Sequence, residues 1–124
     1  MMKKSEEFEI ISTEKFESDL KYYSGKKKYF HITKDVESVI DELEQGTFVG
    51  DKIPNLKIEA NGHAYKVRAA NTDMKVGKSN GYRIIYYVIM DNKVVYLLTI
   101  YSKKDDDKVL SNKEIVELIA KYCL

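Results

Sequence analysis

Cations on predicted strands are the side chains of this sequence that are best suited to chemistry. Only two of its 21 basic residues are arginines, and both fall in strand-like segments: Arg68 in 64–70 and Arg83 in 82–90. Alternation along the first segment places Lys66 on the same face as Arg68. An arginine side chain is a planar, permanently charged fork that matches the oxygens of phosphate and carboxylate groups. If the two segments pair, the three cations converge, which predicts a site for an anionic ligand.

The formal net charge of +1 hides an uneven distribution of charge along the chain. Residues 57–104 contain nine Lys or Arg and three Asp or Glu, a net charge of +6, whereas residues 1–56 carry −3 and residues 105–124 carry −2. A positive local field attracts a nucleic acid, because neutralising successive phosphates releases counterions. The same lysines could instead keep the edges of a small sheet soluble, so charge alone leaves both interpretations open.

Length and composition narrow the class of protein. A chain of 124 residues with 44% hydrophobic residues predicts a single globular domain over 1–124. We expect a cytoplasmic protein, because the sequence has no apolar run of signal-peptide or membrane-helix length. The only cysteine, Cys123, cannot form an internal disulfide, which fits a reducing compartment. The sequence has no Cys/His cluster, so we expect no metal and no cofactor.

The pattern of apolar residues predicts an α+β fold in the order β-α-α-β-β-β-α. Helical spacing predicts helices over 14–23 and 33–45, and a capping box from Ser111 to Glu114 begins a third. Alternating and β-branched residues predict strands over 7–13, 64–70, 82–90 and 93–102. Asp91-Asn92 reads as a two-residue hairpin turn and 46–56 as an irregular connection. We expect a small, mostly antiparallel sheet packed by these helices, with one face or end free for a ligand.

Further candidate residues flank the predicted strands. Lys78 precedes the middle strand, and Lys103 and Lys104 follow the last one. Several tyrosines interleave with the cations, and Tyr87 is a candidate for stacking on bases, although core packing is the commoner role of such rings. His63 immediately precedes the basic strand and is a candidate acid or base, with a polar surface role as the alternative.

The segment 77–87, Gly-Lys-Ser-Asn-Gly-Tyr-Arg-Ile-Ile-Tyr-Tyr, resembles a signature of RelE/ParE superfamily toxins, most closely that of their HigB-like branch. The similarity covers about 57–120 and includes Lys66-Val67-Arg68 and 94–104. It implies a RelE-like fold and a type II toxin that enters the ribosomal A site, cleaves mRNA and is inhibited by a cognate antitoxin. The cleavage would proceed by attack of a ribose 2′-hydroxyl on the adjacent phosphate.

The resemblance also implies roles for individual residues. Arg83 matches the arginine that stabilises the phosphate in the transition state. Lys66 and Arg68 match the basic pair of the preceding strand, and Lys103 and Lys104 match the pair after the last strand.

One position departs from the pattern of the superfamily. Its RelE-type nucleases have a catalytic tyrosine several residues after the last strand, where this chain has Leu110. Lys66, His63 or a tyrosine such as Tyr87 would then have to transfer the proton. The alternative is a non-catalytic protein on the same fold, either a ParE-like toxin that poisons DNA gyrase or a degenerate binding module.

Overall fold

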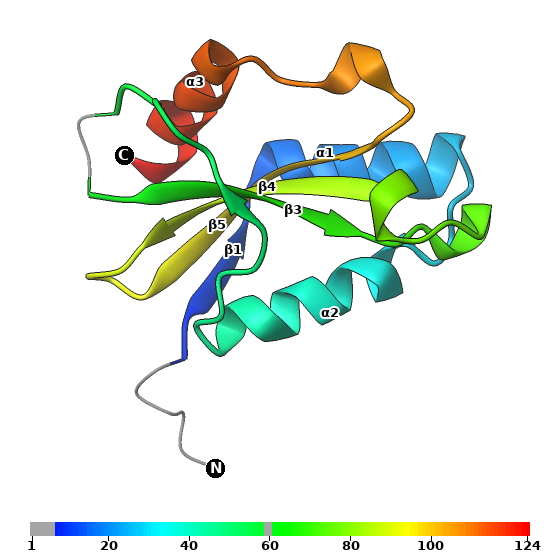
Figure 1. Cartoon of the computed structure of the whole chain (residues 1–124), viewed down its shortest axis with the longest axis horizontal. Coiled ribbons are helices and arrows are strands. Elements are labelled where there is room, and N and C mark those ends of the chain that lie inside the picture. Colours follow the sequence, from blue (N-terminus) through cyan, green and yellow to red (C-terminus); the bar gives the residue numbers. More distant parts are fainter. Residues whose placement is uncertain (1–6, 59–60) are drawn as a thin grey trace.

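A five-stranded sheet forms the centre of the computed structural model, which describes residues 7–58 and 61–124 (Figure 1). The strands lie side by side in the order β1 (Glu9–Ser12), β5 (Val94–Ser102), β4 (Tyr82–Ile89), β3 (His63–Ala69) and β2 (Asp51–Lys52). β1 runs parallel to β5, and the other neighbouring pairs are antiparallel. The predicted α+β class and the mostly antiparallel sheet are confirmed.

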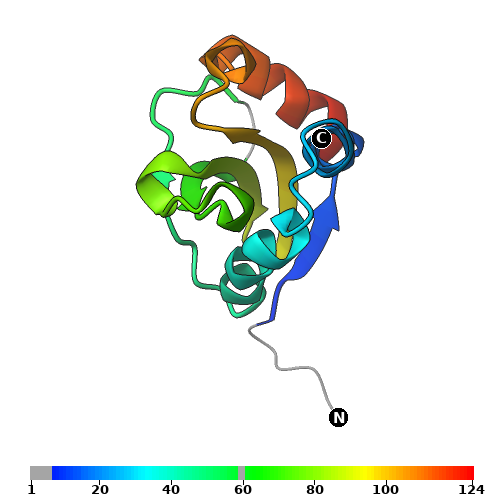
Figure 2. The ribbon, with the colours of Figure 1, turned by 90° about the vertical axis from the view of Figure 1, so that its right-hand side faces the viewer.

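Three α-helices pack around this sheet within the described residues: α1 (Glu14–Lys21), α2 (Ile32–Glu44) and α3 (Asn112–Cys123). α2 and α3 lie on opposite faces of the sheet, and α1 follows β1 along one side (Figure 1 and Figure 2). The predicted capping box is present, since Ser111 and Glu114 each accept a hydrogen bond from the backbone N–H of the other. α1 ends earlier than expected, at Lys21, and continues as a π-helical turn over Tyr22–Lys26.

Apolar side chains fill both faces of the sheet. On the α2 side, Tyr86 of β4 packs in a cluster that includes Leu43. On the α3 side, Tyr87 of the same strand packs in a second cluster with Ile119. Each such side chain contributes about 1.5–3 kcal/mol when it is buried. Because β4 is covered on both faces, its sequence is a nearly continuous apolar run rather than an alternating one.

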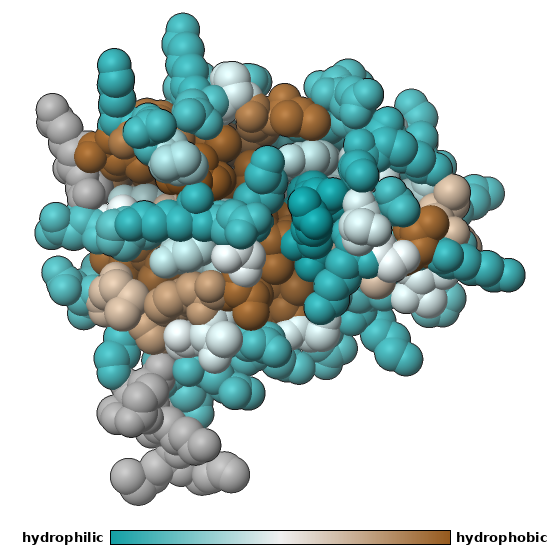
Figure 3. All heavy atoms as spheres, in the orientation of Figure 1, coloured by the Kyte–Doolittle hydropathy of each residue, from teal (hydrophilic) through white to brown (hydrophobic). Residues whose placement is uncertain are grey.

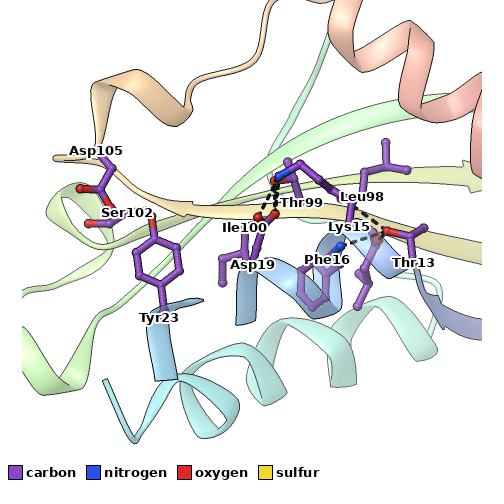
Figure 4. A network of polar contacts seen from close by, with 11 residues as sticks. Thr13, Lys15, Phe16, Asp19, Tyr23, Leu98, Thr99, Ile100, Ser102 and Asp105 are labelled. Atoms are coloured by element: carbon purple, nitrogen blue, oxygen red, sulfur yellow. Dashed lines mark hydrogen bonds and ion pairs between the residues drawn. The ribbon is translucent and has the colours of Figure 1, made fainter. Parts of the chain in front are cut away.

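Side chains of α1 and the following turn complete the outer edge of β5 (Figure 4). β1 ends opposite Leu97, so the later residues of β5 have no strand on that side. Asp19 accepts hydrogen bonds from the backbone N–H of Ile100 at 3.3 Å and from the Thr99 hydroxyl at 2.5 Å. The Tyr23 hydroxyl accepts from the backbone N–H of Ser102 at 2.8 Å. These acceptors pair donors that an exposed strand edge would leave open.

Two connections differ from the sequence prediction. The β4–β5 turn spans 90–93, closed by a 3.1 Å hydrogen bond from Lys93 N to Met90 O, and the residue with positive φ is Lys93 (52°). The segment 46–56 contributes β2, which pairs with β3. Gly50 permits this pairing, because its φ is +98° and a Cβ there would lie 2.4 Å from the Lys66 carbonyl oxygen.

Candidate active site

Lys66, Arg68 and Arg83 share the α3-side face of the sheet. The β3–β4 register places Arg68 directly opposite Arg83 and places Lys66 opposite Ile85. β5 continues the row, with Tyr101 opposite Arg83. Ile85 packs into the cluster under α3, whereas Lys66 and Arg68 are exposed. The strand register therefore places the three cations on one face of the sheet, as expected if the two strands pair.

The Arg83 guanidinium is held by the turn that precedes its own strand. Its side chain donates to the carbonyl oxygens of Lys78 at 3.2 Å, Tyr82 at 3.4 Å and Ser79 at 3.0 Å. Burial lowers the pKa of Arg83, and the charge of Arg68 lowers it further. Like charges at directly opposed strand positions are destabilising, so an anion bound between the two arginines would relieve their repulsion.

Further lysines lie around the same turn, Lys78–Asn80. The Lys103 ammonium lies 3.5 Å from the side-chain oxygen of Asn80. The Lys104 ammonium lies 3.9 Å from the sulfur of Met74, in the segment just before the turn. The three predicted phosphate-binding lysines thus border the end of the sheet at which Arg83 is anchored.

Hydrogen bonds to α2 and the residue before it anchor the segment that carries this turn. His31 Nδ1 lies 2.7 Å from one carboxylate oxygen of Asp73, and the His31 backbone N–H donates to the other at 2.8 Å. Thr72 donates its backbone N–H to Asp35 at 2.9 Å. Burial acts to raise the pKa of Asp73, but the bonds from His31 outweigh it and lower that pKa. Between α2 and β3, Arg68 helps to line a hollow of about 510 Å³.

A smaller hollow of about 230 Å³ opens on the α3 side of the sheet. Its lining includes Lys66, Ile85, Tyr101 and Leu110. Leu110 therefore reaches the hollow with an apolar side chain, and Tyr101 reaches it from β5. Burial raises the pKa of Tyr101, and the nearby Arg83 partly offsets that increase. Sequence reasoning assigned Tyr101 no part in proton transfer, because only the β4–β5 register places it beside Arg83.

Two predicted RNA-binding residues lie away from the cations. Tyr87 is fully buried, and its hydroxyl accepts a hydrogen bond from the backbone N–H of Gly62 at 3.1 Å. The expectation that this ring stacks on bases is therefore wrong, and Tyr87 is a core residue. His63 begins β3 and precedes Arg68 by five residues, about 16 Å along a strand, on the opposite face. The structure does not bring its imidazole to the three cations.

The acidic run after β5 does not form a metal site. Asp105 accepts a hydrogen bond from the Tyr23 hydroxyl at 2.6 Å, which directs its carboxylate toward the π-helical turn. Within residues 7–58 and 61–124, no three His, Cys, Asp or Glu side chains are grouped so that they could hold a metal ion. In that same part of the chain, no helix combines the length and apolarity needed to cross a bilayer.

The surface around β3 combines polar and apolar character. In Figure 3, hydrophilic side chains cover much of the side from which Figure 1 is drawn, and apolar surface remains visible between them.

Comparison with solved structures identifies the fold. A free-state structure of an E. coli toxin RelE variant, with two arginines replaced by alanine, has a TM-score of 0.51 at 16% identity and covers 95% of this chain and 99% of its own. The isolated E. coli RelE toxin has a TM-score of 0.50 at 16% identity and covers 94% and 99%. The chain therefore has a RelE-like fold. No protein-family model and no curated protein matches the sequence significantly, so the HigB-like assignment stays a prediction.

Proposed function

We propose that the protein is the toxin of a toxin–antitoxin pair and cleaves mRNA in the ribosomal A site. One observation carries this proposal: Arg68 and Arg83 are directly opposed on adjacent strands, with Lys66 exposed on the same face. Such an arrangement is unfavourable without a counter-ion and suits a phosphodiester. The RelE-like fold supports the assignment to this class.

In this proposal the cations have different roles. In the reaction, a ribose 2′-hydroxyl attacks the neighbouring phosphorus, and negative charge accumulates on the phosphate oxygens. The exposed side chains of Lys66 and Arg68 can reach those oxygens. Arg83, held by backbone carbonyls, supplies a further positive charge on the same face of the sheet. Lys78, Lys103 and Lys104 would then neutralise flanking phosphates.

Substitution of Arg68 tests the nuclease proposal. Arg68→Ala should lower the rate of mRNA cleavage on ribosomes by about 10²-fold, the typical effect of removing one donor to a transition-state oxyanion. Arg68→Lys should recover only part of it, because an ammonium lacks the two-pronged geometry. Lys57→Ala removes a charge from the same basic segment outside the site and serves as the matched control.

The readouts are growth arrest after induction and primer extension on translated mRNA. The proposal predicts cuts at codon spacing with the wild-type protein and with Lys57→Ala. Arg83→Ala should also relieve growth arrest, and its unfolding transition must be recorded because the side chain braces a turn. Full toxicity of folded Arg68→Ala and Arg83→Ala proteins would refute the proposal.

A cognate antitoxin is part of the same proposal. Co-expression with the product of an adjacent short reading frame should restore growth, and the two proteins should co-purify. The Arg68→Ala experiment tests cleavage and does not depend on finding an antitoxin. A failure to find a partner would therefore count against the antitoxin alone and not against the nuclease activity.

Leu110 favours a second candidate, a toxin that poisons DNA gyrase. Its apolar side chain lies at the hollow beside Lys66, where the nuclease resemblance expects a tyrosine. On this alternative, induction would stop growth with intact mRNA and with broken or arrested DNA. Primer extension and DNA integrity, measured in the same culture, distinguish the two candidates.

A further inference from the structure

The small hollow beside Lys66 is the part of the proposed site where an RNA backbone would meet groups other than cations. Its volume is about 230 Å³, and its lining combines residues of β2, β3, β4, β5 and α3 with the segments that follow β2 and precede α3. Lys52 of β2 and Lys66 of β3 contribute positive charge, Asp51 of β2 contributes a carboxylate, and Ile85 of β4 is one of the apolar residues of the lining. Tyr101 is the lining residue that carries a phenolic hydroxyl.

The Tyr101 hydroxyl is not engaged by another group of the protein. The Tyr101 residue is only 4% exposed. Among the described residues, its hydroxyl has no hydrogen-bond partner, and the same holds for Tyr29 and Tyr82, whereas the hydroxyls of Tyr23, Tyr86 and Tyr87 all have one. The hydroxyl is also not sealed from solvent, because the only enclosed and unpaired side-chain oxygen or nitrogen in that part of the chain belongs to Tyr82. Tyr101 therefore lines the hollow and has an unpaired hydroxyl that is not fully enclosed.

We propose that Tyr101 is the general acid of the cleavage reaction and gives its proton to the departing 5′-oxygen. This inference rests on the nuclease function proposed above. It assigns to a residue on β5 the proton transfer for which Leu110, another lining residue of the same hollow, has no suitable group.

The electrostatics around Tyr101 fit an acid rather than a base. Burial raises the pKa of its phenol, so the group holds its proton at neutral pH. Arg83 acts in the opposite direction, because its positive charge stabilises the phenolate that remains after the proton has left. Hydrogen bonds to the carbonyls of Lys78 and Ser79 favour this position of the Arg83 guanidinium. Arg83 thus lowers the pKa of Tyr101 in addition to supplying positive charge to the site.

The step balances without any further reactant except water. The 2′-oxygen forms a bond to phosphorus, and the bond between phosphorus and the 5′-oxygen breaks. The proton of the 2′-hydroxyl passes to a solvent water molecule, and the Tyr101 proton passes to the 5′-oxygen. The products are a 2′,3′-cyclic phosphate and a free 5′-hydroxyl, and the phenolate then regains a proton from solvent.

An RNA with sulfur in place of the bridging 5′-oxygen tests this role. A thiolate leaves without protonation, so loss of a general acid slows cleavage of the oxygen substrate but not of the sulfur substrate. Tyr101→Phe should cut a ribosome-bound mRNA with the natural linkage about 10²–10⁴-fold more slowly. It should cut the sulfur-linked mRNA at the wild-type rate.

Tyr96→Phe is the matched control, because it removes a hydroxyl from the same strand and the same apolar cluster outside the hollow. It should cleave both substrates at the wild-type rate. If Tyr101→Phe cleaves the natural linkage normally, or slows both substrates equally, Tyr101 is not the acid and only this inference is overturned. If the wild-type protein cleaves neither substrate, the nuclease function fails and the inference fails with it.

Discussion

Replacement of Arg68 by methionine should make the protein more stable at low salt while it weakens RNA cleavage. Arg68 and Arg83 occupy directly opposed positions on β3 and β4. Methionine keeps most of the aliphatic stem of arginine, so the change mainly removes the charge. In an anion-binding site without its ligand, a cationic residue is expected to lower the stability of the protein. The bound anion then supplies the counter-charge that the free protein lacks.

The magnitude follows from the separation and the solvent. Side chains at directly opposed strand positions start about 5 Å apart at Cβ, so the charged heads lie on the order of 7 Å apart. Coulomb's law with the dielectric constant of water then gives about 0.6 kcal/mol of repulsion, and more for a partly buried pair. Arg68 is exposed, which keeps the value near the lower end. We expect Arg68→Met to raise the free energy of unfolding by about 0.5–1 kcal/mol.

Urea titration at two salt concentrations measures this difference. The Debye length is about 10 Å at 0.1 M salt and about 3 Å at 1 M, so the stabilisation should nearly vanish at the higher concentration. Lys66→Met is the control, because Lys66 pairs with Ile85 on one side and with Asp51 on the other. It removes a cation from the same strand whose directly opposed residues are acidic and apolar, so it should leave stability unchanged or slightly lower.

The reasoning is refuted if Arg68→Met and Lys66→Met shift stability equally, or if Arg68→Met lowers it at low salt. Either result would mean that the two arginines do not repel one another in the free protein. The site would then lack the electrostatic cost that makes an anionic ligand favourable.

Three further predictions concern the framework of the protein. Gly62→Ala should destabilise it by about 1–3 kcal/mol, because a Cβ there would lie 2.1 Å from the ring of Tyr87, whereas Gly77→Ala meets no atom within 4 Å and should be tolerated. As the pH falls, Glu114→Gln should lose less stability than the wild type, because hydrogen bonds within the capping box lower the pKa of Glu114. Cys123 should react with a thiolate-specific reagent at pH 8 about 10³-fold more slowly than a free cysteine, since burial raises its pKa to about 12.

Thermal melts compare the two glycine variants, and equal melting temperatures would show that the Tyr87 ring can move aside at little cost. For Glu114, a lowered folded-state pKa means that its contribution is present above the unfolded pKa and is lost as the pH falls through the folded value. If the unfolding free energies of wild type and Glu114→Gln depend on pH in the same way, this prediction is contradicted. A Cys123 thiol that reacts equally fast in native protein and in urea would contradict its burial.

Local patterns were sufficient to predict most of the secondary structure. Alternation gave strands close to β3 and β5, helical spacing gave α2, and the capping box began α3 as expected. These features depend on residues near one another in the chain, so they can be read without knowing the fold. β2 was missed because a two-residue strand has no pattern of its own and depends on pairing with β3.

For the candidate site too, some features could be predicted from the sequence and others depend on the tertiary structure. The sequence by itself determined that three cations could share one face, because side chains alternate along a strand and arginines are confined to 64–70 and 82–90. The sequence also showed that position 110 is a leucine, which lacks the hydroxyl of the tyrosine that the nuclease resemblance expects there. Only the tertiary structure decided which groups meet, since strand register brings Arg83 between Arg68 and Tyr101 and leaves His63 on the opposite face. Register depends on turn geometry and on packing between distant segments, which composition and spacing do not contain.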